Sequence, residues 1–176
     1  MVNKDTQQQK EVNIRETFSS DAAAIAEIYN HYIRQTTITF EEEPVSPAEI
    51  ARRIQRVQSF PLPWLVAELH DEIVGYAYAG KWRERTAYRF SVETTVYVRP
   101  DRCGHGIGYE LYHQLLQELK AKGVHAAMGG IALPNGPSVG LHEKLGFQKV
   151  AHFKEVGFKF DRWIDVGYWQ RILFSL

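Results

Sequence analysis

The chain has 176 residues, and its 21 Lys and Arg balance its 21 Asp and Glu, so the formal net charge is zero. This balance argues against a nucleic-acid-binding protein, which usually carries a basic excess. Hydrophobic residues make up 44% of the chain and charged residues 24%, a composition typical of a globular protein. We therefore expect one domain at residues 11–176, preceded by a flexible N-terminal tail at residues 1–10.

The single cysteine, Cys103, excludes a disulfide framework within the chain and indicates a reducing compartment. The polar start, MVNKDTQQQKEVNI, lacks the apolar centre of a signal peptide. No apolar run approaches the roughly 20 residues that cross a bilayer. We therefore expect a cytoplasmic protein that binds neither membrane nor nucleic acid. The seven histidines lack paired ligand spacing, so no metal site is expected.

The first half of the chain predicts a strand, two helices and a hairpin. Residues 12–18 alternate as a strand does, and the Ser-Asp start of residues 19–35 provides an N-cap for an amphipathic helix. Ser46-Pro47 opens a second helix that runs to about residue 57. Residues 64–70 and 73–80 predict two strands joined by Asp71-Glu72.

The second half predicts a longer alternation of strands and helices. Residues 87–98 predict a long strand, and residues 106–122 predict a helix whose apolar positions are spaced by four. A short buried strand at 124–133, a helix that ends at Gly146 and a closing strand at 165–174 complete the chain. Because strands and helices interleave, we expect a mixed α/β sheet.

Gly104, Gly106 and Gly108 lie at the junction between the long strand and the helix that follows it. Such a junction presents backbone N–H groups at a helix N-terminus, which suits a phosphate or pyrophosphate. The stretch does not fit a P-loop, which needs Gly-Lys-Ser/Thr, or a Rossmann loop, which needs GxGxxG and a later acidic residue. From the glycines alone, a flexible turn without a ligand is the remaining alternative.

The stretch VYVRPDRCGHGIGYELYHQLL resembles the acyl-CoA-binding motif Q/R-x-x-G-x-G/A of the GNAT acetyltransferases. Over roughly residues 12–174, stretches such as LPNGPSVGLHEKLGF and GFKFDRWIDVGYWQRIL resemble the phosphinothricin and methionine sulfone or sulfoximine acetyltransferase branch. The resemblance implies a mostly antiparallel, twisted central sheet that is flanked by helices and splayed at the acyl-CoA site. It also implies a homodimer that acetylates the α-amino group of a small amino acid by direct attack in a ternary complex.

The same resemblance assigns a binding site for acetyl-CoA. Loop amides hold the pyrophosphate, strand 96–98 offers an N–H to the thioester carbonyl, and the pantetheine arm fills a gap beside Gly129-Gly130. Asn135 contacts the CoA arm, although Asn before Gly is also a common turn or cap residue. Cys103 departs from the motif's Q/R, which puts a side-chain contact in doubt. The implied contacts are Val96, Tyr97, Val98, Cys103, Gly104, His105, Gly106, Ile107, Gly108, Tyr109, Asn135 and Lys144.

Amine acetylation requires that the amine lose its proton and that the leaving thiolate be stabilised. Strand alternation places Glu93 with Thr95 and Tyr97, opposite Val92 and Val96. The resemblance makes Glu93 the base, acting directly or through a water, where the alternative is a solvated edge residue. It also makes His142 a candidate acid in place of the tyrosine of most GNAT sequences, where the alternative is a helix-surface histidine.

The segment KWRERTAYRF supplies arginines that suit a carboxylate or phosphinate, although loop arginines are often only solvated. Arg85 departs from the apolar or aromatic residue common in the family, which would favour a polar or acidic substrate. Phe40 is a candidate wall of the same pocket. The expected substrate contacts are Phe40, Arg83, Arg85, Tyr88, Glu93, Thr94 and Thr95. Two other classes remain open: a peptide or protein N-acetyltransferase, and a non-catalytic acyl-CoA-binding regulator.

Overall fold

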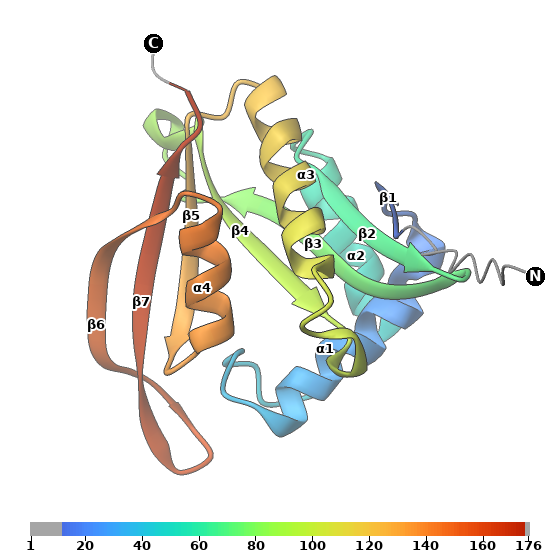
Figure 1. Cartoon of the computed structure of the whole chain (residues 1–176), viewed down its shortest axis with the longest axis horizontal. Coiled ribbons are helices and arrows are strands. Elements are labelled where there is room, and N and C mark those ends of the chain that lie inside the picture. The colour runs from blue at the N-terminus through green and yellow to red at the C-terminus, as the bar shows by residue number, and fades with distance from the viewer. Residues whose placement is uncertain (1–11, 175–176) are drawn as a thin grey trace, which may run out of the picture.

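The computed structural model describes residues 12–174, so the tail expected at residues 1–10 lies outside the described residues. One seven-stranded sheet carries helices on both faces (Figure 1). The strands are β1 (Asn13–Glu16), β2 (Trp64–Leu69), β3 (Glu72–Lys81), β4 (Ser91–Val98), β5 (Ala126–Leu133), β6 (Gln148–Lys159) and β7 (Arg162–Ile172). The helices are α1 (Ala22–Gln35), α2 (Pro47–Gln58), α3 (Ile107–Ala121) and α4 (Gly136–Lys144).

The sheet order is β1-β2-β3-β4-β5-β7-β6, and all neighbours are antiparallel except β4 and β5. The β4–β5 pairing is parallel and joins only 91–93 to 126–128. Beyond that point the two strands separate. The expected mixed, mostly antiparallel and splayed sheet is therefore confirmed.

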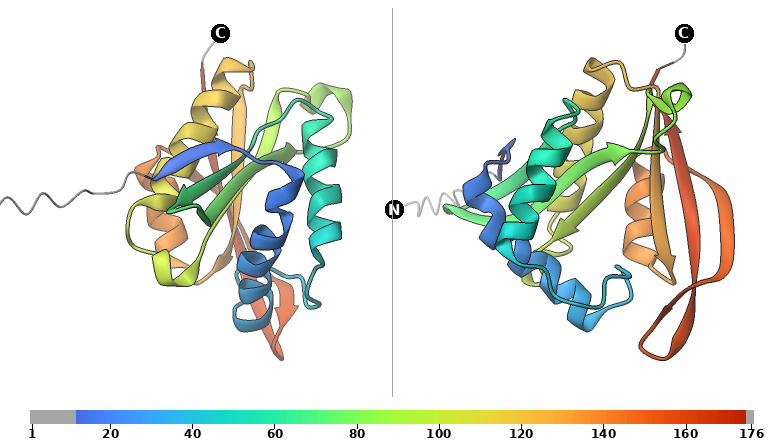
Figure 2. Two further views of the ribbon diagram at one scale, coloured as in Figure 1. Left: turned by 90° about the vertical axis from the view of Figure 1, so that its right-hand side faces the viewer. Right: turned by 180° about the vertical axis from the view of Figure 1, so that it is seen from behind.

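Two apolar layers hold the helices against the sheet. Leu111, Leu115 and Leu119 of α3 recur every four residues and are completely buried against β2–β5. α4 lies on the same face as α3, whereas α1 and α2 cover the opposite face (Figure 2). Ile25 and Ile54 are buried in this second layer, which includes the tyrosine-rich side of β3. The sheet between these layers is therefore supported on both faces beside the splay.

Several local predictions are corrected by the structure. The β2–β3 turn residues are His70 and Asp71, which both have positive φ, rather than Asp71-Glu72. A 3₁₀ turn at Thr86–Tyr88 delays the start of β4 to Ser91. Ser46 does cap α2, through the Glu49 N–H. Asp21 instead accepts from the Phe18 N–H and from Arg15, so it stabilises the chain before α1 without capping that helix.

Strand β6 was not expected, because its sequence QKVAHFKEVGFK lacks a clear alternation of buried and exposed residues. It is the edge strand of the sheet, and most of its side chains are exposed. Its pairing with β7 shifts register twice, at Lys149/Ala151 and at Phe153/Gly157. The long β6–β7 hairpin extends past the rest of the sheet in Figure 1. Its position beside β7 therefore depends on tertiary pairing more than on local pattern.

Candidate active site

A cavity of about 740 Å³ lies where β4, β5, β7 and β6 meet two loop segments. Its walls are largely apolar and aromatic, with few charged groups. Glu93 lies on the β4 side, and Arg83 lies on the loop that precedes β4. This combination of an apolar wall with a few converging polar groups is typical of a small-molecule site. The remaining lining residues are Ile38, Phe40, Trp82, Tyr88, Ser91, Met128, Gly130, Ala132, Val150, Ala151, Phe153, Val156, Val166, Tyr168 and Gln170.

Glu93 is a half-buried carboxylate that projects from β4 into this cavity. Burial raises its pKa, and the positive charge of Arg83 partly opposes that rise. A carboxylate with a raised pKa holds a proton more tightly than an ordinary one. Glu93 is therefore better suited than a solvated glutamate to accept a proton from an amine or from a water.

Gly129 and Gly130 of β5 let side chains approach the strand from its two faces. A Cβ on Gly130 would lie 3.1 Å from Glu93 Oε1, on the cavity side. A Cβ on Gly129 would lie 2.3 Å from His142 Nε2, on the α4 side. The close approach that this glycine pair indicates is made here by two side chains of the protein itself. Glu93 and His142 thus lie against adjacent residues of β5, on opposite faces of the strand.

His142 is buried and belongs to a chain of hydrogen bonds through the protein interior. Its Nδ1 lies 2.8 Å from the Ser138 carbonyl oxygen, and its Nε2 lies 2.9 Å from the Tyr112 hydroxyl. Tyr112 in turn contacts the Thr94 hydroxyl at 2.5 Å, and Thr94 donates to the Met128 carbonyl. Burial lowers the pKa of His142, which favours its neutral form. The alternative of a solvated helix-surface histidine does not fit this position.

The number of protons available to the hydrogen bonds from His142 to Thr94 differs between the two protonation states of His142. Because a carbonyl only accepts, Nδ1 must be the donor to Ser138, and a neutral His142 then accepts at Nε2 from Tyr112. Neutral His142, Tyr112 and Thr94 carry three protons in all for the four contacts. Protonated His142 supplies the fourth, since Nε2 can then donate to Tyr112 and Tyr112 to Thr94. The neutral form therefore has no proton between the Tyr112 and Thr94 hydroxyl oxygens, and the hydrogen bond between them forms when His142 takes up a proton and is lost when His142 releases it.

The glycine loop lies at the end of β4, where β4 and β5 separate. Gly104 and Gly106 have φ of +82° and +85°, a conformation that glycine adopts easily. Gly106 is the N-cap of α3 and has no side chain that could accept from the first-turn N–H groups. These N–H groups point out of the start of the helix, toward the loop. Beyond 91–93, β4 has no pairing with β5. Both features leave backbone donors available to a phosphate-bearing, extended ligand.

Comparisons with known proteins place these features in one family. Residues 14–167 match the acetyltransferase (GNAT) domain. The chain is 42% identical to a phosphinothricin N-acetyltransferase of Streptomyces viridochromogenes, over 93% of this chain and 89% of that relative. It is 36% identical to an L-methionine sulfoximine/L-methionine sulfone acetyltransferase of Salmonella typhimurium, over 90% of this chain and 93% of that relative.

Among solved structures, a GNAT superfamily phosphinothricin acetyltransferase from Sinorhizobium meliloti in complex with acetyl-CoA superposes with a TM-score of 0.89. It is 36% identical and covers 92% of this chain and 88% of its own. The chain belongs to the GNAT acetyltransferases. It is therefore an acetyl-CoA-dependent acyltransferase, and the expected family, fold and co-substrate are confirmed.

The residues of this GNAT acetyltransferase fit acetyl-CoA at the glycine loop. Tyr109 follows the loop in α3, and Lys144 of α4 lies over its ring at 4.6 Å, so both border the loop. Cys103 is exposed, with its Sγ 3.7 Å from the Tyr32 hydroxyl. Asn135 caps α4 by accepting from the Ser138 N–H, so the cap role is shown and a contact with the CoA arm stays a prediction.

The structure brings together four of the seven expected substrate contacts. Phe40, Arg83, Tyr88 and Glu93 line the cavity. Arg85 lies in a neighbouring depression, so the reasoning that it favours an acidic substrate has no support in the cavity wall. Thr94 points to the opposite face of β4, toward Tyr112, and Thr95 pairs with Tyr78 of β3 away from the lining. Alternation along the strand already separates Thr94 from Glu93.

Trp82 and Tyr168 are cavity residues that the sequence reasoning did not assign. Their rings meet edge to face at 5.4 Å, and Tyr168 also touches the space where a Cβ on Gly130 would be. Tyr168 belongs to the motif WIDVGYWQR, which carried the resemblance without a role for this residue. Among residues 12–174, no helix is long and apolar enough to cross a membrane, and no His, Cys, Asp and Glu side chains cluster as a metal site would require.

Glu93→Gln should stabilise the protein at about pH 8 and have no effect near pH 4. Because burial raises the folded-state pKa of Glu93, its contribution to stability is greatest below its unfolded-state pKa and is lost as pH rises through the folded-state value. Glutamine resembles the protonated acid, so the variant avoids that loss. Thermal unfolding at the two pH values measures the difference. Glu84→Gln, in the exposed loop, is the control, and an equal effect of both variants would contradict the assignment.

Proposed function

We propose that the protein transfers the acetyl group of acetyl-CoA to the α-amino group of a small amino acid or analogue of the phosphinothricin or methionine sulfone type. One observation carries the proposal. A half-buried carboxylate with a raised pKa, Glu93, lies over Gly130 inside a largely apolar cavity that also holds Arg83. That cavity of about 740 Å³ has the size of a small-molecule site.

Acetyl-CoA, when bound, supplies the acetyl thioester. Glu93 removes the proton from the attacking amine, directly or through a water, so that a neutral amine is present in the apolar cavity. Arg83 lies close enough to Glu93 to lower its pKa in part. It also provides a cation for an acidic group of the amino acid. The amides of 96–98 and of the glycine loop bind and orient the co-substrate. Direct attack in a ternary complex requires no covalent role for Cys103.

His142 provides the proton for the leaving group. The protonated imidazolium is the proposed acid, and because burial lowers the pKa of His142 this form gives up its proton more readily than an ordinary histidine and returns to the favoured neutral form. Tyr112 and Thr94 reorganise their hydrogen bonds as His142 gains or loses that proton. They are positioning residues, because each acts through His142.

The active form is proposed to be a homodimer, as the family resemblance implies. The edge hairpin β6–β7 exposes Phe158 at 50%, Val156 at 60% and Trp163 at 62%, an unusual density of large apolar groups. Val156 also lines the cavity, so a second subunit on this hairpin would shield the cavity from water. Covering an edge strand also removes an unpaired sheet edge.

Thiol release from acetyl-CoA should be measured with phosphinothricin, methionine sulfone, methionine sulfoximine, common amino acids and short peptides. We expect selective turnover of one of the amino-acid analogues. Glu93→Gln should lower turnover by about tenfold or more, with little change in acetyl-CoA binding. Turnover of peptides alone would point to a peptide acetyltransferase. CoA binding without turnover of any amine would favour the non-catalytic regulator.

Thr94→Val should lower kcat about tenfold while leaving KM for both substrates nearly unchanged, because it removes a hydroxyl that the protonated form of the chain uses. Thr94→Ser keeps the hydroxyl and should retain most of the activity. Steady-state kinetics across pH tests both variants. Equal losses in the Val and Ser variants would assign Thr94 a packing role only.

Light scattering should give a mass of about twice 20.3 kDa for the native protein. Trp163→Glu places a charge on the proposed interface and should shift the mass toward the monomer. Phe18→Glu changes an aromatic residue with a similar exposed fraction, 60%, and should leave the mass unchanged. Phe18 follows β1, the edge strand opposite β6. A monomeric native protein would overturn the homodimer without affecting the assignment of the chemistry.

A further inference from the structure

Lys159 is a buried cation that takes no part in the chemistry above. It lies at the end of β6, its side chain is completely enclosed, and only 2% of the residue is exposed. Its Nζ donates to the carbonyl oxygens of Thr39 and Glu41, each at 2.8 Å. Burying an ammonium group is costly unless it is hydrogen-bonded. Such a group is expected to hold something in place, and here both partners belong to one loop.

That loop, residues 36–46, joins α1 to α2 and contains no regular secondary structure. It carries Ile38 and Phe40, which form one wall of the amino-acid cavity. Phe40 packs directly over Gly157 of β6, where a Cβ would lie 2.3 Å from the ring. Gly157 and Lys159 are two residues apart, so one short stretch of β6 contacts both the Phe40 ring and the backbone on either side of it.

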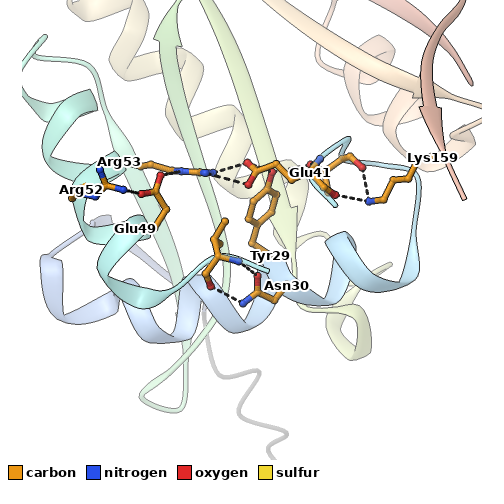
Figure 3. A network of polar contacts seen from close by, with 9 residues as sticks. Tyr29, Asn30, Glu41, Glu49, Arg52, Arg53 and Lys159 are labelled. Carbon is orange, nitrogen blue, oxygen red and sulfur yellow. Dashed lines mark hydrogen bonds and ion pairs between the residues drawn. The ribbon is translucent and has the colours of Figure 1, made fainter. Parts of the chain in front are cut away.

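The other side of the loop is tied to the helices. The Glu41 carboxylate accepts from Arg53 at 2.7 and 3.1 Å and from the Tyr29 hydroxyl at 2.9 Å. Asn30 exchanges two hydrogen bonds with the Val45 backbone. Figure 3 shows this arrangement, with Arg53 reaching Glu41 from one side and Lys159 reaching the loop backbone from the other.

The two sides of this arrangement are far apart in the sequence. The bonds from Lys159 span 120 and 118 residues, and they connect the edge hairpin to a loop that precedes α2. Val150, Phe153 and Val156 form the β6 wall of the cavity, and Ile38 and Phe40 form its loop wall. The distance between these two walls therefore depends on what holds the loop against β6.

We propose that Lys159 is a positioning residue that sets the width of the amino-acid cavity by holding Phe40 and Ile38 against the β6–β7 hairpin. This inference rests on the proposed function, because it concerns which amino acids the cavity accepts. Lys159 touches neither the reacting groups nor the glycine loop. Its removal should therefore weaken amino-acid binding and selectivity, and it should leave acetyl-CoA binding and the proton-transfer residues intact.

Lys159→Met keeps the length of the side chain and removes the three donors. We expect the KM for the preferred amino acid to rise about tenfold, with kcat changed less than about threefold and the KM for acetyl-CoA unchanged. Selectivity against amino acids with larger side chains should fall. Lys120→Met, at an exposed position on α3 away from the cavity and the β6–β7 hairpin, is the control and should leave every constant unchanged. A fall in kcat at constant KM, or an equal rise in the KM for acetyl-CoA, would overturn the proposal.

A double-mutant cycle tests whether Lys159 acts through Phe40. In a Phe40→Ala background, Lys159→Met should change the KM for the amino acid by less than about twofold, because the group being positioned is gone. Fully additive effects would contradict the proposal. Gly157→Ala offers a second route with Lys159 intact, since its new Cβ would displace the Phe40 ring. It should also raise the KM for the amino acid, and an unchanged KM would contradict the proposed role of Phe40.

Hydrogen exchange of the free protein separates this inference from the proposed function. The amides of residues 36–46 should exchange faster in Lys159→Met than in the native protein or in Lys120→Met, and this result does not depend on which amino acid is the substrate. Unchanged exchange would overturn the positioning role even if the amino-acid assay succeeds. If no amino acid is turned over, the proposed function fails while faster exchange would still support the tie between loop and hairpin. A change in the light-scattering mass of Lys159→Met would attribute its effects to assembly and so contradict the proposal.

Discussion

The pairing of β4 with β5 is the constraint on which the site depends. These two strands run parallel and are hydrogen-bonded only at 91–93 and 126–128, after which they separate. A parallel pair needs a crossover, and α3 provides it. The crossover starts directly where β4 ends, so the free N-terminus of α3 and the open edge of β4 lie together. This single crossover thus creates both the glycine turn proposed to bind phosphate and the gap proposed for an extended ligand.

The glycine pair in β5 brings the chemistry of two faces to one strand. At Gly130 the cavity side has room for Glu93, and at Gly129 the helix side has room for His142. Any side chain at either position would push a proposed proton acceptor or donor away from the strand. The arrangement carries a thermodynamic cost, because Glu93 is partly desolvated and the charge of Arg83 compensates for this only in part. Because burial raises the pKa of Glu93, its ionised form is expected to stabilise the fold less at neutral pH than a solvated carboxylate would.

The cavity itself is assembled from segments that are distant in the chain. Its floor comes from β4, β5 and β7, which the central sheet holds firmly. Its outer walls come from an irregular loop and an edge strand, which have fewer backbone partners. Side-chain hydrogen bonds hold the loop where regular backbone pairing does not. Arg53 binds the Glu41 carboxylate from one side, and Lys159 binds the loop backbone from the other (Figure 3). A strand and a helix, β4 with Glu93 and α4 with His142, therefore carry the groups proposed for proton transfer, while the irregular loop and the edge strand carry Ile38 and Phe40 and the wall beside them.

The sequence by itself determined most of the elements, since the apolar spacing of α3, the cap at Ser46 and the glycine turn are local signals that need no partner. It also made Glu93 a candidate, because a carboxylate in a half-buried strand needs a task or a partner and because the family resemblance implies a base at this position. Only the tertiary structure decided β6, whose weak alternation becomes a strand by pairing with β7. It alone brought Thr94 to Tyr112, placed Arg85 in a neighbouring depression outside the cavity wall and brought Lys159 to the loop that carries Phe40. Local patterns record which way a side chain faces along one element, whereas contacts between residues 120 apart arise only when the sheet order is set.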